Sequence, residues 1–283
     1  MPRIAFVTDS TAYIPAELIQ KYDIKVAPQV LIWGNEQLLD GVDITPDQFY
    51  ARLKTAEVMP TTSEVNAGTF KTMLDPLVAQ GLPVVMVLIS SKLSGTINSA
   101  QHAKEMLPAG ARVEIVDSEA TSMALGFQVL AAARTAEAGK SLDEVVRVAR
   151  KAKEHTGVFF VVDTLEFLHR GGRIGGASKL FGTALNIKPL LELRDGRVEP
   201  VERIRTKAKA LARLLDVLEE RIGGRKPVRL CAIHAAAEDE ARALLEKAEK
   251  RFGPVESFIS PASPVVGAQA GPGTVGMAFS FGV

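Results

Sequence analysis

Three strand-length apolar segments in the first half of the chain each end in a turn rich in hydroxyl and acidic side chains. Residues 4–7 lead into Thr8-Asp9-Ser10-Thr11, and residues 84–89 lead into Ser90-Ser-Lys-Leu-Ser94-Gly95-Thr96. Residues 113–116 are followed by Asp117-Ser118 in the same way. Uninterrupted apolar segments of this length are typical of strands buried on both faces, as in parallel sheets.

Helices are expected between these strands. They fit residues 67–80, 97–106 and 123–139, the last of which is alanine-rich with apolar residues at helical spacing. Apolar strands alternating with helices predict an α/β fold whose parallel sheet is covered on both faces. The segment 26–41 fits no strand–helix–strand unit, and we expect it to leave this first domain.

The pattern changes in the second half of the chain. Helices fit residues 142–153, 206–222 and 237–252, and strands fit residues 157–162, 188–193, 197–201, 228–234 and 275–281. Arg194-Asp-Gly-Arg197 indicates a hairpin turn. These elements predict a second α/β domain with a mixed sheet and helices on one face. We place the boundary at residue 156, which gives domains of residues 1–156 and 157–283.

Charge and hydropathy narrow the classes of partner. Lys and Arg number 34 against 33 Asp and Glu, so the net charge of +1 favours neither nucleic acid nor an anionic membrane. The first residues lack the features of a secretory signal, and the longest apolar runs are far too short to span a membrane. The single cysteine, Cys231, leaves no internal disulfide and no cysteine-based zinc cluster. We therefore expect a cytoplasmic protein with no integral membrane segment.

The hydroxyl-rich turns are candidates for ligand binding, because open parallel sheets bind ligands beyond the carboxyl ends of their strands. Ser94-Gly95-Thr96 is the most suggestive, since a helix is expected to begin there and a helix N-terminus favours an anion. The alternative interpretation is that these Ser, Thr and Asp side chains cap helices and close turns.

Other motifs leave several classes of protein open. The glycine-rich segment 171–176 could cradle phosphate or form an exposed connection, and Gly271-Pro-Gly273 is interpreted as a tight turn rather than a dinucleotide site. The four histidines show no metal-ligand spacing. A hydrolase or acyltransferase using Ser94 as nucleophile is the enzymatic alternative, although no G-x-S-x-G motif is present. The basic clusters leave a regulatory module that binds another acid or nucleic acid as a third possibility.

In order along the chain, several of these segments resemble the DegV family of bacterial fatty-acid-binding proteins. The matching pieces are Ile4-Ala-Phe-Val-Thr-Asp-Ser-Thr11, Pro60-Thr-Thr-Ser63, Ser91-Lys-Leu-Ser-Gly-Thr96, Val116-Asp-Ser118, Leu165-Glu-Phe-Leu-His-Arg-Gly-Gly-Arg-Ile174, Asn186-Ile-Lys-Pro-Leu190, Arg203-Ile-Arg-Thr206 and Gly271-Pro-Gly273. The resemblance implies a three-layer α/β/α domain, a second two-layer α/β domain with a mixed sheet, and a fatty acid enclosed between them. It also implies a separate fatty acid kinase, which would phosphorylate the carboxyl group and would itself supply ATP and metal. No cofactor, metal or catalytic residue is expected in this chain.

The resemblance also implies roles for individual residues. Thr62 and Ser94 are expected to hydrogen-bond the carboxyl group, with Ser63 and the Gly95 N–H nearby. Where the family typically has a histidine, two residues before Gly-Pro-Gly, this chain has Gln269, which can hydrogen-bond but cannot become cationic. That departure puts competence in acyl-phosphate formation in doubt. Three arginines match positions expected to contact the kinase or the phosphorylated head group: Arg170, Arg173 and Arg205.

The acyl chain would supply most of the binding free energy. Burying one methylene contributes about 0.8 kcal/mol, so about 15 of them contribute roughly 12 kcal/mol before ordering costs. The hydroxyl cluster would add only about 1–3 kcal/mol and would mainly orient the acid. Apolar residues that could line the tunnel, or equally form ordinary core, are Phe160, Leu165, Leu168, Phe181, Leu185 and Ile187.

Overall fold

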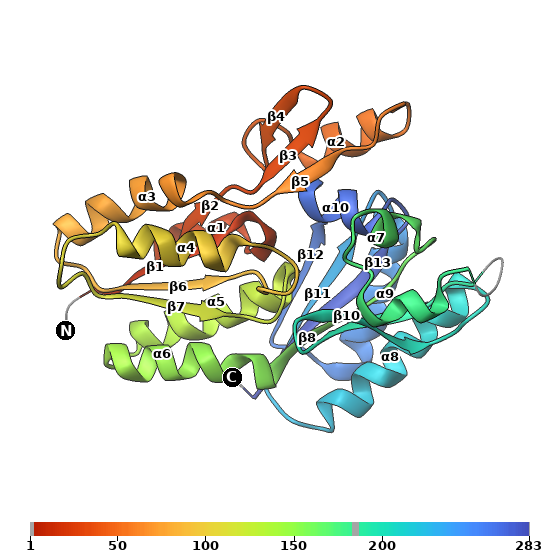
Figure 1. Ribbon diagram of the computed structural model, residues 1–283. Coiled ribbons are helices and arrows are strands. Elements are labelled where there is room, and N and C mark those ends of the chain that lie inside the picture. The colour runs from red at the N-terminus through yellow and green to blue at the C-terminus, as the bar shows by residue number, and fades with distance from the viewer. Residues whose placement is uncertain (1–2, 183–186, 283) are drawn as a thin grey trace.

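The computed structural model describes residues 3–182 and 187–282. In this part of the chain the strands form a parallel sheet, a mixed sheet and a small antiparallel sheet. Figure 1 shows the two large sheets side by side, with the small sheet at the top. The predicted α/β fold with a parallel sheet and a separate mixed sheet is confirmed.

The parallel sheet has the strand order β2-β1-β6-β7. Its strands are β1 (Ala5–Asp9), β2 (Lys25–Ala27), β6 (Val84–Leu88) and β7 (Val113–Asp117). Every residue of β6 is buried, because alternate side chains meet different helices. Met86 packs in a cluster with α3 and α4, whereas Val85 and Val87 pack in a cluster with α1, α5 and α6. These helices are α1 (Ala16–Tyr22), α3 (Ala67–Ala79), α4 (Thr96–Glu105), α5 (Ser122–Glu137) and α6 (Leu142–Lys151). The expected three layers are present.

The mixed sheet has the strand order β10-β9-β8-β13-β11-β12. Its strands are β8 (Thr156–Val161), β9 (Leu190–Arg194), β10 (Arg197–Glu202), β11 (Val228–His234), β12 (Glu256–Pro261) and β13 (Val275–Phe281). One face, which includes Phe159 and Met277, packs against α8 (Lys207–Ile222) and α9 (Glu238–Phe252). The other face, which includes Val158 and Ala278, packs against α5. Helix α5 therefore joins the two large sheets.

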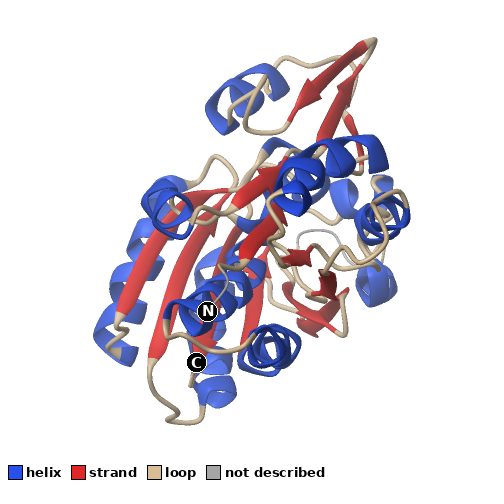
Figure 2. Cartoon of the chain, turned by 90° about the vertical axis from the view of Figure 1, so that its left-hand side faces the viewer, coloured by secondary structure: helices blue, strands red, loops and turns tan. Residues whose placement is uncertain are grey.

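The small sheet stands apart from the other two and projects from the top of the molecule in both views (Figures 1 and 2). It contains β3 (Val30–Trp33), β4 (Glu36–Leu39) and β5 (Thr61–Ser63), all antiparallel. The expectation that residues 26–41 leave the parallel sheet holds for β3 and β4, whereas β2 pairs with β1. The helix α2 (Pro46–Leu53) connects this sheet to the second half of the chain, because Tyr50 Oη donates a hydrogen bond of 3.2 Å to the Ala262 carbonyl.

Short helices complete the fold. They are α7 (Glu166–Arg170), α10 (Pro264–Ala270) and the 3-10 segments η1 (Ser10–Ala12), η2 (Ala152–His155) and η3 (Gly175–Leu180). Among the described residues, no helix combines the length and the apolar character that crossing a bilayer requires. The division into domains 1–156 and 157–283 stays a prediction, because α5 is shared between the two large sheets.

Candidate functional site

A cavity lies where the carboxyl edge of the parallel sheet, the inner face of the mixed sheet and α10 meet. It contains about 1000 Å³ of empty space, counting its open mouth. Much of its wall is apolar, with side chains from the turn after β6, from the mixed sheet, from α7 and from α10: Ile89, Leu93, Val158, Phe160, Leu168, Leu193, Val198, Ile233, Val265 and Val266. An apolar cavity with a few polar groups is the usual form of a small-molecule site.

Ser94 lies in the turn between β6 and α4, on the cavity wall. Its Oγ is 2.9 Å from Thr96 Oγ1 and accepts a hydrogen bond of 3.3 Å from the Thr96 amide. Buried Gln29 in turn donates from Nε2 to Thr96 Oγ1 at 2.9 Å. This chain of hydrogen bonds fixes Ser94 at the start of α4, where the sequence predicts a helix to begin.

Thr62 and Gln269 meet across the cavity wall although 207 residues separate them. Gln269 Nε2 donates a hydrogen bond of 3.0 Å to Thr62 Oγ1, which joins α10 to β5. The other amide atom, Gln269 Oε1, is buried without a hydrogen-bond partner in the described part of the chain. A methyl group on Gly171 would lie 1.6 Å from that oxygen, so the glycine makes room for the amide.

The structure brings most of the predicted ligand-binding residues to one place. Thr62, Ser63, Ser94 and Gln269 all line the cavity. Gly95 is the N-cap of α4 but is not among the described lining residues, and a methyl group there would lie 3.3 Å from the Glu64 carboxyl carbon. Their roles toward a carboxyl group stay predictions.

The three predicted arginines lie in different environments. Arg173 is half-buried on the cavity wall, where Nε donates to the Leu93 carbonyl at 3.0 Å and Nη1 to the Gly171 carbonyl at 2.7 Å. Arg170 is exposed and forms an ion pair of 2.9 Å with Glu166. Arg205 is exposed as well. Only Arg173 is positioned to contact a group inside the cavity.

The predicted tunnel residues divide between cavity and core. Phe160 and Leu168 line the cavity, whereas Leu165 and Ile187 pack in the hydrophobic cluster beside it. Phe181 is exposed and stacks on His169, with ring centroids 4.0 Å apart. Leu185, like Asn186 of the matching segments, lies outside the described residues.

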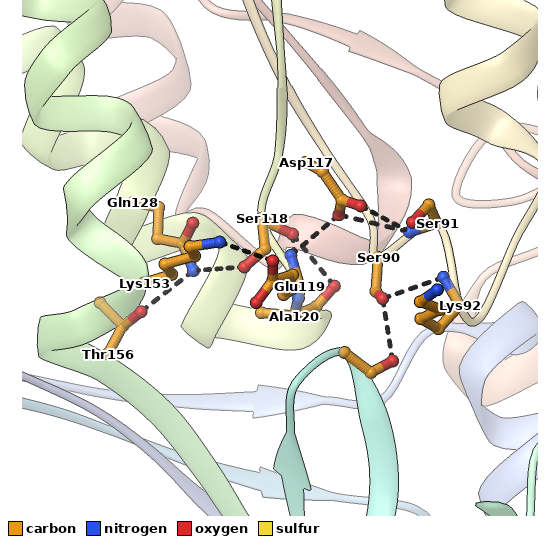
Figure 3. Close-up of polar contacts among 11 residues, drawn as sticks. Ser90, Ser91, Lys92, Asp117, Ser118, Glu119, Ala120, Gln128, Lys153 and Thr156 are labelled. Atoms are coloured by element: carbon orange, nitrogen blue, oxygen red, sulfur yellow. Dashed lines mark hydrogen bonds and ion pairs between the residues drawn. The ribbon is translucent and has the colours of Figure 1, made fainter.

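Several hydroxyl and acidic groups of the strand-end turns have structural partners instead. Ser90 Oγ donates a hydrogen bond of 2.8 Å to the Gly196 carbonyl in the turn between β9 and β10. Ser118 Oγ donates to the Ala120 carbonyl at 3.2 Å and accepts from the Ala120 amide at 3.1 Å, in the turn after β7 (Figure 3). Asp9 is fully buried and accepts from the Ile89 amide at 2.7 Å, while its burial raises its pKa. For Asp9, Ser90 and Ser118 the alternative interpretation of caps and turns is correct.

Further polar residues on the wall were not among the predicted site residues, and they include Tyr13, Gln29, Thr121 and Ser122. Tyr13 Oη accepts a hydrogen bond of 2.9 Å from the Ser263 amide, and burial raises the pKa of its phenol. Thr121 and Ser122 follow β7 at the same sheet edge as Ser94, so the rule that singles out Ser94 could have found them. Tyr13 and Gln29 carry no comparable signal. Within residues 3–182 and 187–282, no group of three or more His, Cys, Asp and Glu side chains is arranged to hold a metal ion.

Comparisons with known proteins match this chain to one family along almost its whole length. The family model described as "Uncharacterised protein, DegV family" matches residues 3–281. A DegV domain-containing protein of Streptomyces coelicolor is 41% identical over 279 residues and is covered to 98%, as is this chain. The structure of a DegV family protein from Thermus thermophilus, described by its fatty acid binding, gives a TM-score of 0.93 at 34% identity and covers 99% of each chain. DegV of Bacillus subtilis, described as a fatty acid binding protein, gives a TM-score of 0.90 at 31% identity and covers 99% of this chain and 100% of its own.

Proposed function

The chain belongs to the DegV family, and from this premise we propose that it binds one long-chain fatty acid in the cavity between its two large sheets. The observation that carries the proposal is that Thr62, Ser94 and Gln269, from three separate segments, lie on the wall of one largely apolar cavity. The proteins from Thermus thermophilus and Bacillus subtilis, similar along their whole length, are described as binding fatty acids.

In this proposal the hydroxyls of Thr62 and Ser94 hold the carboxyl group. Thr62 Oγ1 already accepts from Gln269 Nε2, so its proton is free to be donated to a carboxylate oxygen. Ser63 lies next to Thr62 on the same wall, and Gly95 adjoins Ser94 at the start of α4, where the helix dipole favours a negative charge. The apolar wall then buries the acyl chain, which supplies most of the affinity.

The protein would deliver the acid rather than react with it. We propose that it acts in the cytoplasm and presents the carboxyl group to a separate fatty acid kinase, which forms the acyl phosphate. Exposed Arg170 and Arg205 are the candidates for contact with that kinase. Arg173, inside the cavity, is the candidate for contact with the phosphorylated head group.

A carrier is better supported than a hydrolase or acyltransferase that uses Ser94. The Ser94 hydroxyl is paired with the hydroxyl of Thr96, and no histidine is among the lining residues in the described ranges. Gln269, which lies on the same wall, cannot take up a proton as a general base would. A serine nucleophile needs such a base within hydrogen-bonding reach.

Native mass spectrometry of the purified protein tests the proposal directly. We expect an added mass that corresponds to one long-chain fatty acid, and delipidated protein should bind one equivalent in a titration. Absence of both a retained acid and a titratable one would refute the carrier function. Turnover of an acyl ester, lost in Ser94→Ala, would instead establish the enzyme.

A further inference from the structure

A second helix begins on the cavity wall, separate from α4, which follows Ser94. Helix α5 is 16 residues long, and it starts at Ser122 with Thr121 as its N-cap. Both residues line the cavity. The Thr121 side chain makes no capping hydrogen bond, although Ser and Thr at this position usually make one.

The hydroxyls of both residues are buried and unused. Thr121 Oγ1 and Ser122 Oγ have no hydrogen-bond partner within the described residues. Ser122 is only 4% exposed, and it holds a left-handed backbone conformation with φ of 59°. A buried hydroxyl without a partner is costly, so such groups normally have one in the functional state of a protein.

Three other hydroxyls on the same wall have partners within the protein. Thr11 Oγ1 donates to Asp9 at 2.7 Å, and Thr274 Oγ1 donates to the Ala270 carbonyl at 2.9 Å. Tyr13 Oη accepts from the Ser263 amide at 2.9 Å. The structure thus pairs these three hydroxyls within the protein but leaves Thr121 Oγ1 and Ser122 Oγ, on two residues of the same wall, without a partner among the described residues.

The pair is well placed to meet the chain of the ligand rather than its carboxyl group. Helix α4, whose start carries Ser94, covers one face of the parallel sheet, whereas α5 covers the other (Figure 1). Helix α5 packs against β8 and β13, and the cavity wall includes apolar Val158 and Ile233 from this mixed sheet. Thr121 and Ser122 thus form a second polar region of the cavity wall, beside apolar residues of the mixed sheet.

The charges around the cavity select a neutral partner for the two hydroxyls. Among the described lining residues Arg173 is the only cation and Glu64 the only carboxylate, and the Arg173 guanidinium donates to the Leu93 and Gly171 carbonyls. A second carboxylate buried beside α5 would lack a counter-ion, which is costly. An uncharged oxygen can accept from both hydroxyls and benefits from the N-terminus of α5.

We propose that Thr121 and Ser122 form a subsite for an uncharged hydroxyl substituent on the chain of the bound acid. The ligand class is then a hydroxylated long-chain fatty acid, with the unsubstituted acid as a weaker ligand. This inference rests on the proposed function, since it places the carboxyl group at Thr62 and Ser94. A site whose polar groups pair with a ligand hydroxyl discriminates against the analogue that lacks it.

The test compares an unsubstituted saturated acid with the positional series of its monohydroxy derivatives of equal length, each titrated into delipidated protein. At least one isomer should bind about fivefold to tenfold more tightly than the parent acid, as expected for one buried hydrogen bond. Thr121→Val removes one hydroxyl at nearly constant shape, and Ser122→Gly removes the other while suiting the left-handed backbone. Each should reduce the preference, and the double variant should abolish it.

Thr135→Val is the matched control. Thr135 lies on the same helix, its hydroxyl donates to the Ala131 carbonyl at 2.7 Å, and it is not a lining residue, so the preference should survive. If the parent acid binds but no isomer binds more tightly, the subsite is refuted while the carrier function stands. A preference that survives in the folded double variant also refutes it, and failure of every acid to bind refutes both proposals.

Discussion

Gln269 on α10 donates a hydrogen bond of 3.0 Å to the hydroxyl of Thr62 on β5. This contact joins the small sheet to the second half of the chain at the proposed carboxyl site. It depends on Gly171, since a methyl group at that position would lie 1.6 Å from Gln269 Oε1. Three segments far apart in the sequence therefore position one threonine hydroxyl.

Gly171→Ala is predicted to weaken fatty acid binding without unfolding the protein. Gly171 has φ of −73° and ψ of −11°, which alanine adopts without strain. The new methyl group would displace the flexible end of Gln269 and break its bond to Thr62. We expect a loss of affinity of about fivefold, near the value of one hydrogen bond, measured by titration of delipidated protein.

A double-mutant cycle gives this prediction its control. In the Gln269→Ala background there is no amide left to displace, so Gly171→Ala should cause no further loss of affinity. An equal loss in both backgrounds would show that Gly171 acts by another route. Unchanged melting temperatures would establish that the fold is intact.

Ser94→Ala is predicted to lower affinity about fivefold to tenfold, because it removes one donor to the carboxyl group. Gln29→Leu should lower affinity to a smaller extent, since it leaves Ser94 in place and removes the hydrogen bond that holds the Thr96 hydroxyl beside Ser94. Ser99→Ala changes a serine of α4, the helix that follows Ser94, outside the cavity and serves as the control. A titration in which Ser94→Ala matches Ser99→Ala would remove Ser94 from the site.

The strands of the parallel sheet could be predicted because burial on both faces leaves an unambiguous pattern. All five residues of β6 are apolar and buried, and the sequence locates that strand to within one residue. Helix α10 could not be predicted, because it has only seven residues, begins with a proline and includes Gly267. A methyl group at Gly267 would lie 2.4 Å from Tyr50 Oη, so α10 depends on close packing against a distant helix.

The site shows the same division between local and long-range information. The start of α4 at Ser94-Gly95-Thr96 is a local pattern, and the sequence alone singles it out. The pairing of Thr62 with Gln269 spans 207 residues, so only the family resemblance points to both. Buried Gln29 supports Ser94 through Thr96, and no sequence pattern marks it.

The buried carboxyl group of Asp40 should make the stability of the fold depend on pH. Burial raises its pKa from 3.8 to about 6, although Ser10 Oγ donates to its Oδ2. A protonated Asp40 carboxyl group is therefore more stable in the folded state than in the unfolded state. As pH rises from about 4 to about 6 the group ionises, and the buried carboxylate lowers the stability of the fold. Asp40→Asn removes the penalty, and its gain over the parent in free energy of unfolding should grow by about 2 kcal/mol between pH 4.5 and pH 7.

Urea unfolding at a series of pH values measures this difference, and exposed Asp239→Asn controls for the loss of one carboxylate. A constant difference between Asp40→Asn and the parent protein across this range would contradict the prediction. A difference that shrinks as pH rises would show that the pKa of Asp40 is lowered by folding, which would also contradict the prediction.

Arg170→Glu is predicted to separate delivery of the acid from its binding. Arg170 is exposed on α7, pairs only with the exposed carboxylate of Glu166 among the described contacts, and does not line the cavity. Reversing its charge should leave affinity for the fatty acid within twofold, because exposed ion pairs contribute little to the fold. Charges at the rim of an interface mainly set association rates, so phosphorylation of the bound acid by a cognate kinase should slow at least tenfold at low salt.

Lys247→Glu is the control, since it makes the same change at an exposed position of α9, and it should slow the kinase much less. Equal rates for the two variants would place the kinase contact elsewhere.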